Sequence, residues 1–161
     1  MLIPYEGGWD FSNLKYIDLQ KNEKDKYLTQ KGDLLFNRTN SKELVGKTAV
    51  YGSEEPMAIA GYLIRVRTNE YGNPYYISAY LNSKHGKTTL LNMCKSIVGM
   101  ANINAQELQN IKILLPPRPL QDKFEKVVIS TKNKVKTLSS AEHCSNQMFS
   151  ALSRKAFAGE L

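Results

Sequence analysis

The last quarter of the chain most constrains its fold. From Leu120 onward, apolar side chains recur at steps of three, four or seven residues, and no glycine or proline interrupts the chain until Gly159. This pattern predicts one amphipathic helix of about 38 residues, roughly 57 Å long at 1.5 Å per residue. Its stripe comprises Leu120, Phe124, Val128, Thr131, Val135, Leu138, Ser145, Met148, Leu152 and Ala156. Such a helix outreaches a small domain, so a second surface must cover the stripe.

The residues before the helix mix strand and helix patterns without a regular order. The predicted strands are 33–36, 48–51, 59–66 and 111–115, and the predicted helices are 75–83, 87–96 and 105–108, with a basic loop at 83–86. Irregular mixing of this kind is typical of α+β proteins. We therefore expect an α+β fold, in which a mixed-sheet domain over residues 1–117 precedes the long helix of residues 118–161.

Several positions carry specific structural expectations. In the strand at 59–66, the period of two predicts one packed face and one face that presents Arg65 and Arg67. Gly32 and Gly46 are expected in turns that need positive φ, and Pro116 and Pro117 are expected to end a strand. The aromatic residues expected in the core or half-buried are Tyr16, Tyr27, Phe36, Tyr62 and Tyr80.

Composition limits the class of protein. The chain has 161 residues, 42% of them hydrophobic, a net charge of +7 and a pI of about 9.3, so it has one modest core and a polyanion is a reasonable partner. Residues 1–117 hold 14 Lys and Arg against 11 Asp and Glu, and residues 118–161 hold 8 against 4, so the excess is spread over both parts. Cys94 and Cys144 form no CxxC pair, and we find no secretory signal or membrane-spanning run. These features predict a cytoplasmic protein.

The motifs that suggest catalysis fail on inspection. Gly46-Lys47-Thr48 and Gly86-Lys87-Thr88 resemble the end of a phosphate-binding loop, but Ser41 and Leu81 stand where that loop needs a glycine. His85 and His143 have no ligand partners at metal-binding spacing. No nucleophile–base arrangement or metal-held carboxylate cluster can be assembled. We therefore expect no catalytic residue, no metal and no cofactor.

Two clusters of polar and basic residues are candidates for DNA contact. Arg, Asn and Lys are suited to base edges and phosphates, and a basic loop can enter a groove. The candidate DNA-binding residues are Arg38, Asn40, Lys42, Lys47, Ser83, Lys84, His85 and Lys87. The alternative interpretation is ordinary solvated surface, because most lysines in any protein are exposed.

The segment 31–40, KGDLLFNRTN, resembles the target-recognition domain of the specificity subunit of type I restriction-modification enzymes. Other segments fall in the family's order: Leu14-Lys15-Tyr16-Ile17, Lys26-Tyr27-Leu28, Ala101-Asn102-Ile103-Asn104, Leu114-Leu115-Pro116-Pro117 with Gln121, and Ala156-Phe157-Ala158-Gly159-Glu160-Leu161. The resemblance covers nearly the whole chain. It implies a non-catalytic module that reads part of a bipartite site in double-stranded DNA, with methylation and restriction carried by separate modification and restriction subunits.

The resemblance also concerns the long helix. A complete specificity subunit has two recognition domains and two antiparallel helices, whereas this chain matches one of each. It therefore implies a homodimer, or pairing with another specificity subunit, through Phe124, Val128, Val135, Leu138, Met148 and Leu152. The match begins after the family's opening segment, which favours an alternative: a truncated homologue that acts as an assembly or regulatory partner without reading DNA. A small basic enzyme or RNA-binding protein is a further alternative, which lacks a catalytic constellation and an aromatic RNA-binding motif.

Overall fold

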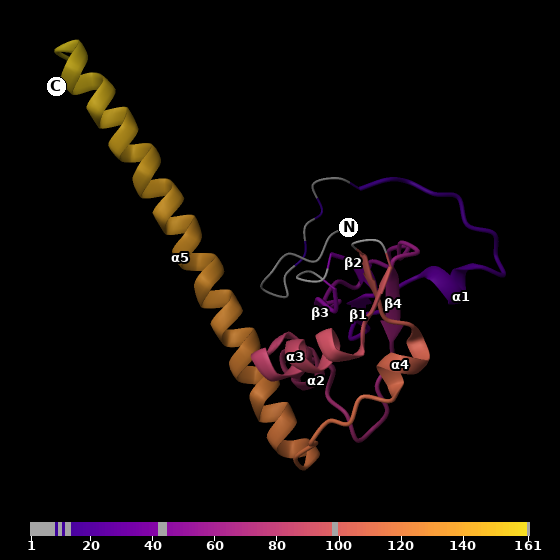
Figure 1. Ribbon diagram of the computed structural model, residues 1–161. Helices are drawn as coiled ribbons and strands as arrows, with labels where there is room; N and C mark the ends of the chain where they lie inside the picture. The colour runs from indigo at the N-terminus through magenta and orange to yellow at the C-terminus, as the bar shows by residue number, and fades with distance from the viewer. Residues whose placement is uncertain (1–8, 10, 12–13, 42–44, 98–99, 161) are drawn as a thin grey trace. The chain divides into compact units, whose positions relative to one another are not determined.

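The computed structural model describes residues 9, 11, 14–41, 45–97 and 100–160, and it divides into two compact units, Met1–Asp122 and Lys123–Leu161 (Figure 1). The first unit holds two small antiparallel sheets and four short helices. The second consists of the greater part of a long helix. The α+β class predicted from the sequence is confirmed.

The first sheet is organised around strand β1 (Leu34–Asn37). It lies between β3 (Thr48–Val50) and β4 (Leu63–Val66), antiparallel to both. Leu34 and Phe36 belong to one apolar cluster and Leu35 to another, and all three side chains are fully buried. A strand that is covered on both faces needs a continuous apolar run, which explains the sequence of β1.

The second sheet continues directly from the first. It has the order β2 (Thr39–Asn40), β6 (Met100–Asn102), β5 (Lys95–Ile97), again antiparallel. Arg38 alone separates β1 from β2: its N–H donates to the Tyr62 carbonyl (2.9 Å), and its carbonyl accepts from the Ile103 N–H (3.0 Å). The backbone of Arg38 is therefore fixed where the chain leaves one sheet for the other.

Three of the short helices that the structure describes begin with a side-chain cap. After α1 (Lys24–Tyr27), α2 (Pro74–Asn82) begins at a proline, and the Asn73 side chain accepts from the Tyr75 and Tyr76 N–H groups. α3 (Lys84–Met93) follows immediately. α4 (Ala105–Gln109) begins with a capping box between Asn104 and Glu107. Leu81 and Leu90, from α2 and α3, join the cluster of Leu34 and Phe36.

The expected basic loop at 83–86 is instead the start of α3. Ser83 is its N-cap, and Lys84, His85 and Gly86 form its first turn. Gly86 is buried, and a Cβ atom there would lie 2.1 Å from the Tyr80 carbonyl oxygen. Two helices can therefore succeed one another at this point only because residue 86 lacks a side chain.

The prediction of a strand at 111–115 is wrong. These residues have no ladder partner among the described strands and run as irregular chain, with Ile111 packed against the main apolar cluster. The Tyr76 hydroxyl donates to the Leu114 carbonyl (3.0 Å), which ties the segment to α2. Pro116 and Pro117 therefore follow a packed connector and do not end a strand.

The aromatic and glycine expectations have mixed outcomes. Phe36 is fully buried and Tyr27 and Tyr80 are half-buried, as predicted. Tyr16 is fully exposed, and Tyr62, the residue before β4, is exposed with 36% of its surface accessible. Both expected glycines have positive φ, +91° at position 32 and +75° at position 46.

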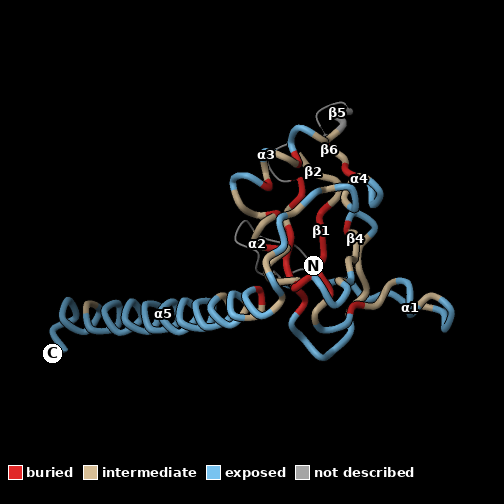
Figure 2. Tube along the Cα trace, turned by 90° about the horizontal axis from the view of Figure 1, so that it is seen from below, coloured by how far each residue is buried: buried red, intermediate tan, exposed pale blue. Residues whose placement is uncertain are grey.

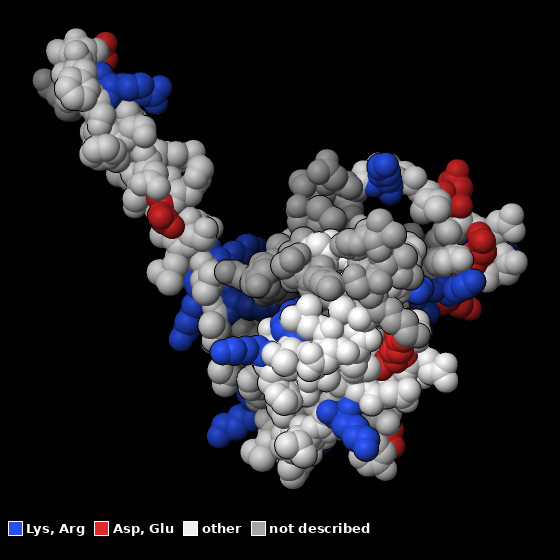
Figure 3. Space-filling model, in the orientation of Figure 1, with Lys and Arg blue, Asp and Glu red and all other residues white. Residues whose placement is uncertain are grey.

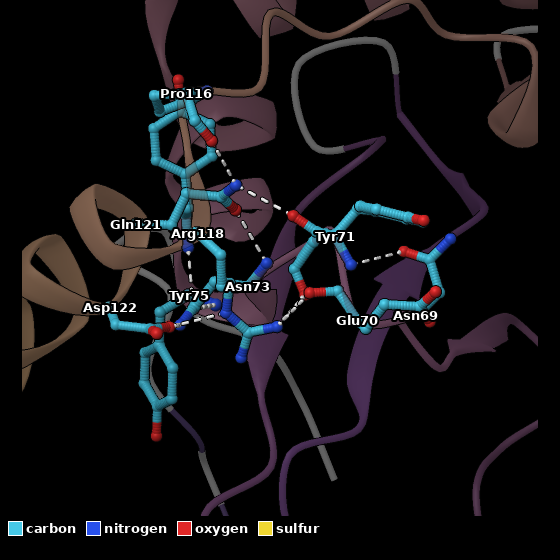
Figure 4. A network of polar contacts seen from close by, with 11 residues as sticks. Asn69, Glu70, Tyr71, Asn73, Tyr75, Pro116, Arg118, Gln121 and Asp122 are labelled. Atoms are coloured by element: carbon cyan, nitrogen blue, oxygen red, sulfur yellow. Dashed lines mark hydrogen bonds and ion pairs between the residues drawn. The ribbon is translucent and has the colours of Figure 1, made fainter.

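Helix α5 (Arg118–Ala158, 41 residues) begins within the first unit. Figure 4 shows the polar network around its first turn, centred on the fully buried side chain of Gln121. Its Oε1 accepts from the Asn73 N–H (2.8 Å), and its Nε2 donates to the carbonyls of Tyr71 (2.9 Å) and Pro116 (2.7 Å). Asp122 accepts from Asn73 Nδ2 (2.9 Å). The first turn is therefore bonded to the α2 N-terminus.

Beyond Asp122, α5 runs without interruption to Ala158, and its residues are mostly exposed (Figure 2). The long helix predicted from the sequence is thus confirmed and slightly longer than expected. Val128 is half-buried, and the other predicted pairing residues are exposed: Phe124 (37%), Val135 (57%), Leu138 (69%), Met148 (61%) and Leu152 (51%). Among the described residues, no helix combines the length and apolar character needed to span a bilayer.

Candidate nucleic-acid interface

The two ends of β1 differ in how their positive charges are compensated. At the start of β1, the buried carboxylate of Asp33 forms ion pairs with Arg67 (2.8 Å) and Arg65 (3.9 Å). Arg65 also donates to the carbonyls of Leu28 and Asp25. The hydrogen bond that Arg67 donates to Asp33 raises the pKa of Arg67. Ile64 and Val66 pack against the core while Arg65 and Arg67 are held by Asp33 and backbone carbonyls, partners that the alternation of residues did not predict.

At the other end of β1, cationic nitrogens lack such compensation. Arg38 donates from one terminal nitrogen to Asn102 Oδ1 (3.4 Å), whereas its Nε is buried without a hydrogen-bond partner among the described residues. Asn40 lies two residues further on, in β2, where its Oδ1 accepts from the Ser41 N–H (2.9 Å). Lys42 lies outside the described residues. We call this region the basic end of β1; it comprises Arg38, Asn40, Lys47, Lys84, His85 and Lys87.

The fold brings the two sequence clusters together at Lys47. Immediately before it, Gly46 passes so close to α3 that a Cβ atom would lie 2.5 Å from Leu90 Cδ1. Immediately after it, Thr48 exchanges two hydrogen bonds with the Asn82 side chain (3.2 and 2.7 Å). Lys47 therefore lies beside the end of α2 and the start of α3. Its charge acts on Lys87, which is in α3.

Lys87 is the most perturbed residue of this region. Its Nζ atom is buried and has no hydrogen-bond partner within the part of the chain that the structure describes. Burial, and secondarily the positive charge of Lys47, lowers the pKa of Lys87 to about 8. At pH 7 about a tenth of this side chain is therefore uncharged, rising to about half at pH 8, and a nearby anion would favour the charged form.

The remaining candidates of α3 have different surroundings. The Ser83 hydroxyl donates to the Tyr80 carbonyl (2.6 Å) and accepts from the Gly86 N–H (3.1 Å), so capping engages it on both sides. Lys84 and His85 are exposed, and the His85 ring lies edge-on to Tyr80 with centroids 5.8 Å apart. Both project from a helical turn, which holds them more rigidly than a loop would.

Asn102 and Asn82 were not identified as site residues from the sequence. Asn102 faces Arg38 because β6 pairs with β2 in the register Thr39↔Asn102. Asn82 fixes the backbone next to Lys47. Neither residue has a local sequence signal, since each acts on a partner more than thirty positions away.

Charge distribution alone does not locate the interface. Basic side chains are spread over the face of the molecule shown in Figure 3 and do not gather in one patch. Within the described ranges, no three His, Cys, Asp or Glu side chains come together as a metal-binding group. The local geometry at the basic end of β1 is therefore the stronger guide.

Comparison with known proteins places the chain in a family. Residues 3–146 match the type I restriction modification DNA specificity domain. The chain belongs to this family, in agreement with the resemblance seen in its motifs. Members of the family are DNA-sequence specificity components.

Two curated proteins illustrate the relationship. The putative type I restriction enzyme MjaX specificity subunit of Methanocaldococcus jannaschii is 28% identical over 92% of this chain and 36% of its own length. The type I restriction enzyme EcoKI specificity subunit of Escherichia coli K12 is 26% identical over 96% of this chain and 35% of its own length. The chain thus spans about a third of the length of these relatives.

Proposed function

We propose that this chain is a non-catalytic DNA-reading module of a type I restriction-modification system, and that it contacts duplex DNA with the basic end of β1. The observation that carries the proposal is the contrast between the two ends of this strand. Asp33 compensates the arginines at one end, whereas at the other end Arg38 and Lys87 keep buried cationic nitrogens to which no described residue gives a hydrogen-bond partner. Uncompensated buried cations cost stability, so their retention suits a site that meets an anion.

Different side chains suit different parts of the duplex. Lys47 and Lys84 suit phosphate contacts, which add affinity and salt dependence but carry no sequence information. Arg38 and Asn40 suit base edges, because their forked donors and acceptors match guanine and adenine in the major groove. His85, exposed like Lys84, is a further candidate for contact with a base or a phosphate. Lys42 remains a proposed contact from the sequence, and for Ser83 the capping role comes first.

A salt-titrated binding assay tests the proposal. The full chain should bind a fluorescent duplex with an affinity that falls steeply with salt, and Lys47→Met should reduce the slope of log K against log salt by about one unit. Lys112→Met is the matched control. The neighbours of Lys112, Ile111 and Ile113, line a cavity together with Leu34. Leu34 is four residues before Arg38, which is about 13 Å along β1 at 3.3 Å per residue, so Lys112 is away from the proposed surface. Equal slopes for the two variants would contradict the proposed surface.

The names of the two relatives suggest which proteins this module binds. Both are specificity subunits of type I restriction enzymes, so we propose that this chain docks modification and restriction subunits and supplies them with part of a bipartite site. Methylation and cleavage would then belong to those subunits. Such assemblies act on DNA in the cytoplasm, and we place the chain there.

The exposed stripe of α5 supports a second element of the proposal. Val135, Leu138, Met148 and Leu152 are all more than half exposed. An apolar strip of this kind normally marks an interface. We propose that two copies pair through antiparallel helices in a two-fold dimer, or that a second specificity subunit takes the place of one copy.

The same stripe favours an alternative function, in which the chain pairs with a specificity subunit as an assembly or regulatory partner and reads no DNA. The salt titration separates the two functions. If the wild-type chain pairs through its helix, and its affinity for duplex at low salt is no higher than that of the Lys47→Met variant, the chain is an assembly partner.

A further inference from the structure

The buried ammonium group of Lys87 is unusual for a lysine. Lysine side chains normally carry the charged end into water while the aliphatic stem packs. Lys87 does the reverse, because the Nζ atom is buried and none of the described residues accepts a hydrogen bond from it. An ammonium group has three donors, and leaving them unmade in a buried place is unfavourable. A methionine at this position would avoid that cost.

Several titratable groups lie on the elements around Lys87. α3 itself contributes Lys84 and His85, and the chain entering β3 contributes Lys47. α2, which packs against α3, contributes the phenol of Tyr80. Of these groups, Lys47 is the one whose charge lowers the pKa of Lys87. An anion that approaches Lys47 would reverse the sign of the local field.

We propose that Lys47 binds a phosphate group of the DNA backbone, and that the buried Lys87 takes up a proton from solvent as this phosphate arrives. The inference rests on the proposed DNA-reading function and specifies how one contact of that surface works. The neutral amine becomes an ammonium ion, and no bond to the phosphate is required, because the negative charge stabilises the proton through space. Binding at this site is therefore coupled to pH.

The sign of the coupling follows from linkage. In the free protein the pKa of Lys87 is lowered to about 8, mainly by burial and then by Lys47. If bound DNA restores it toward the ordinary lysine value, the complex holds one more proton than the free protein above pH 8. Affinity should then be nearly constant below pH 8 and fall by about tenfold between pH 8 and pH 9.5.

Two variants separate this effect from other titrations. Lys87→Met should retain the fold, since it removes a buried charge, and should lose the decline in affinity above pH 8. Lys84→Met is the matched control, because it makes the same change at the exposed lysine that begins the same helix. It should keep the decline whatever it does to the affinity itself. A decline that is equal in Lys87→Met and wild type would overturn the proposal.

Nuclear magnetic resonance of ¹³C-lysine-labelled full-length chain gives a readout that does not depend on affinity. The Lys87 amine should titrate near pH 8 in the free protein, at a higher pH with inorganic phosphate, and at a still higher pH with a short duplex. Lys47→Met should raise the pKa of free Lys87 and abolish the response to phosphate. If duplex binds but leaves the Lys87 titration unchanged, the coupling is wrong and the DNA-reading function stands. If no duplex binds at any salt concentration, both are wrong.

Discussion

Gln121 offers a stringent test of how the long helix is attached to the domain. Replacing it by leucine keeps the size of a fully buried side chain but removes all three of its hydrogen bonds, to the Asn73 N–H and to the carbonyls of Tyr71 and Pro116. Each bond contributes about 1 kcal/mol net, and the substitution would take this partner from the buried Asn73 N–H and from the partly buried carbonyls of Tyr71 and Pro116. Burial of the added apolar surface offsets about 1 kcal/mol of this loss. Gln121→Leu should therefore lower the free energy of unfolding by about 2–4 kcal/mol.

Urea unfolding followed by tryptophan fluorescence measures this cost. Trp9 is the only tryptophan of the chain. It lies in the first unit, where its Nε1 donates to the Val50 carbonyl (2.9 Å) and its ring meets Tyr51 edge-on. With an m-value of about 2 kcal/mol/M, the unfolding midpoint should fall by about 1–2 M urea.

The controls isolate the hydrogen bonds. Gln106→Leu makes the same chemical change at an exposed position of α4 and should alter stability by less than about 0.5 kcal/mol. Gln121→Glu keeps an acceptor for the Asn73 N–H but places a carboxylate against two carbonyls, so at pH 7 it should be at least as damaging as leucine. If Gln121→Leu unfolds within about 0.5 kcal/mol of wild type, the proposed anchoring of α5 is refuted.

Three further predictions concern backbone strain, pH and the helix stripe. Gly46→Ala should cost about 2–3 kcal/mol, because its φ is +75° and the new methyl group meets Leu90 Cδ1 at 2.5 Å, whereas Gly32→Ala, with φ +91° and open space, should cost about 1 kcal/mol; equal unfolding midpoints would contradict this. Because the pKa of Lys87 is lowered to about 8 on folding, the unfolded chain binds more protons between that pH and about 10.4, so stability should rise with pH across this window, by about 1–2 kcal/mol after discounting for partial exposure. Lys87→Met should lack that rise in pH-dependent urea unfolding, and a wild-type protein without it would refute the assignment. Leu138→Glu should dissociate the proposed dimer in sedimentation at tens of micromolar while leaving the urea midpoint of the domain unchanged; a wild-type monomer with a fully formed helix would argue against pairing.

Local patterns in the sequence determine much of this fold. The apolar run of β1, the proline at the start of α2, and the uninterrupted stripe of α5 each predicted the element that forms. In each case the signal lies within the element itself, as periodicity, capping or the absence of glycine and proline. The motif at 31–40 likewise indicated the family before the comparison did.

The failures concern contacts between distant residues. The apolar alternation at 111–115 indicates a strand, but a strand also needs a ladder partner, and that depends on the whole fold. The compensation of Arg65 and Arg67 by Asp33 joins residues more than thirty positions apart. The start of α3 is different, because Ser83 was a recognisable N-cap and only the expectation of a loop concealed it.

The candidate site shows the same division. The sequence shows two separate clusters of residue types suited to DNA. It does not show that the two clusters come together in the fold. Lys47 meets the α3 side only because Gly46 packs on Leu90 and Thr48 bonds to Asn82. The buried state of Lys87 could not be predicted either, since its surroundings come from several elements.

Selection of bound duplexes from a pool with random sequence tests the central claim most directly. The full chain, incubated with the pool at moderate salt and sequenced after several rounds, should enrich a short fixed motif. Arg38→Ala or Asn40→Ala should relax preference at a single position by about 1–3 kcal/mol if that residue reads a base. Lys112→Met should enrich the same motif as wild type. Binding that enriches no sequence at any salt concentration would contradict the account of this chain as a DNA-reading module.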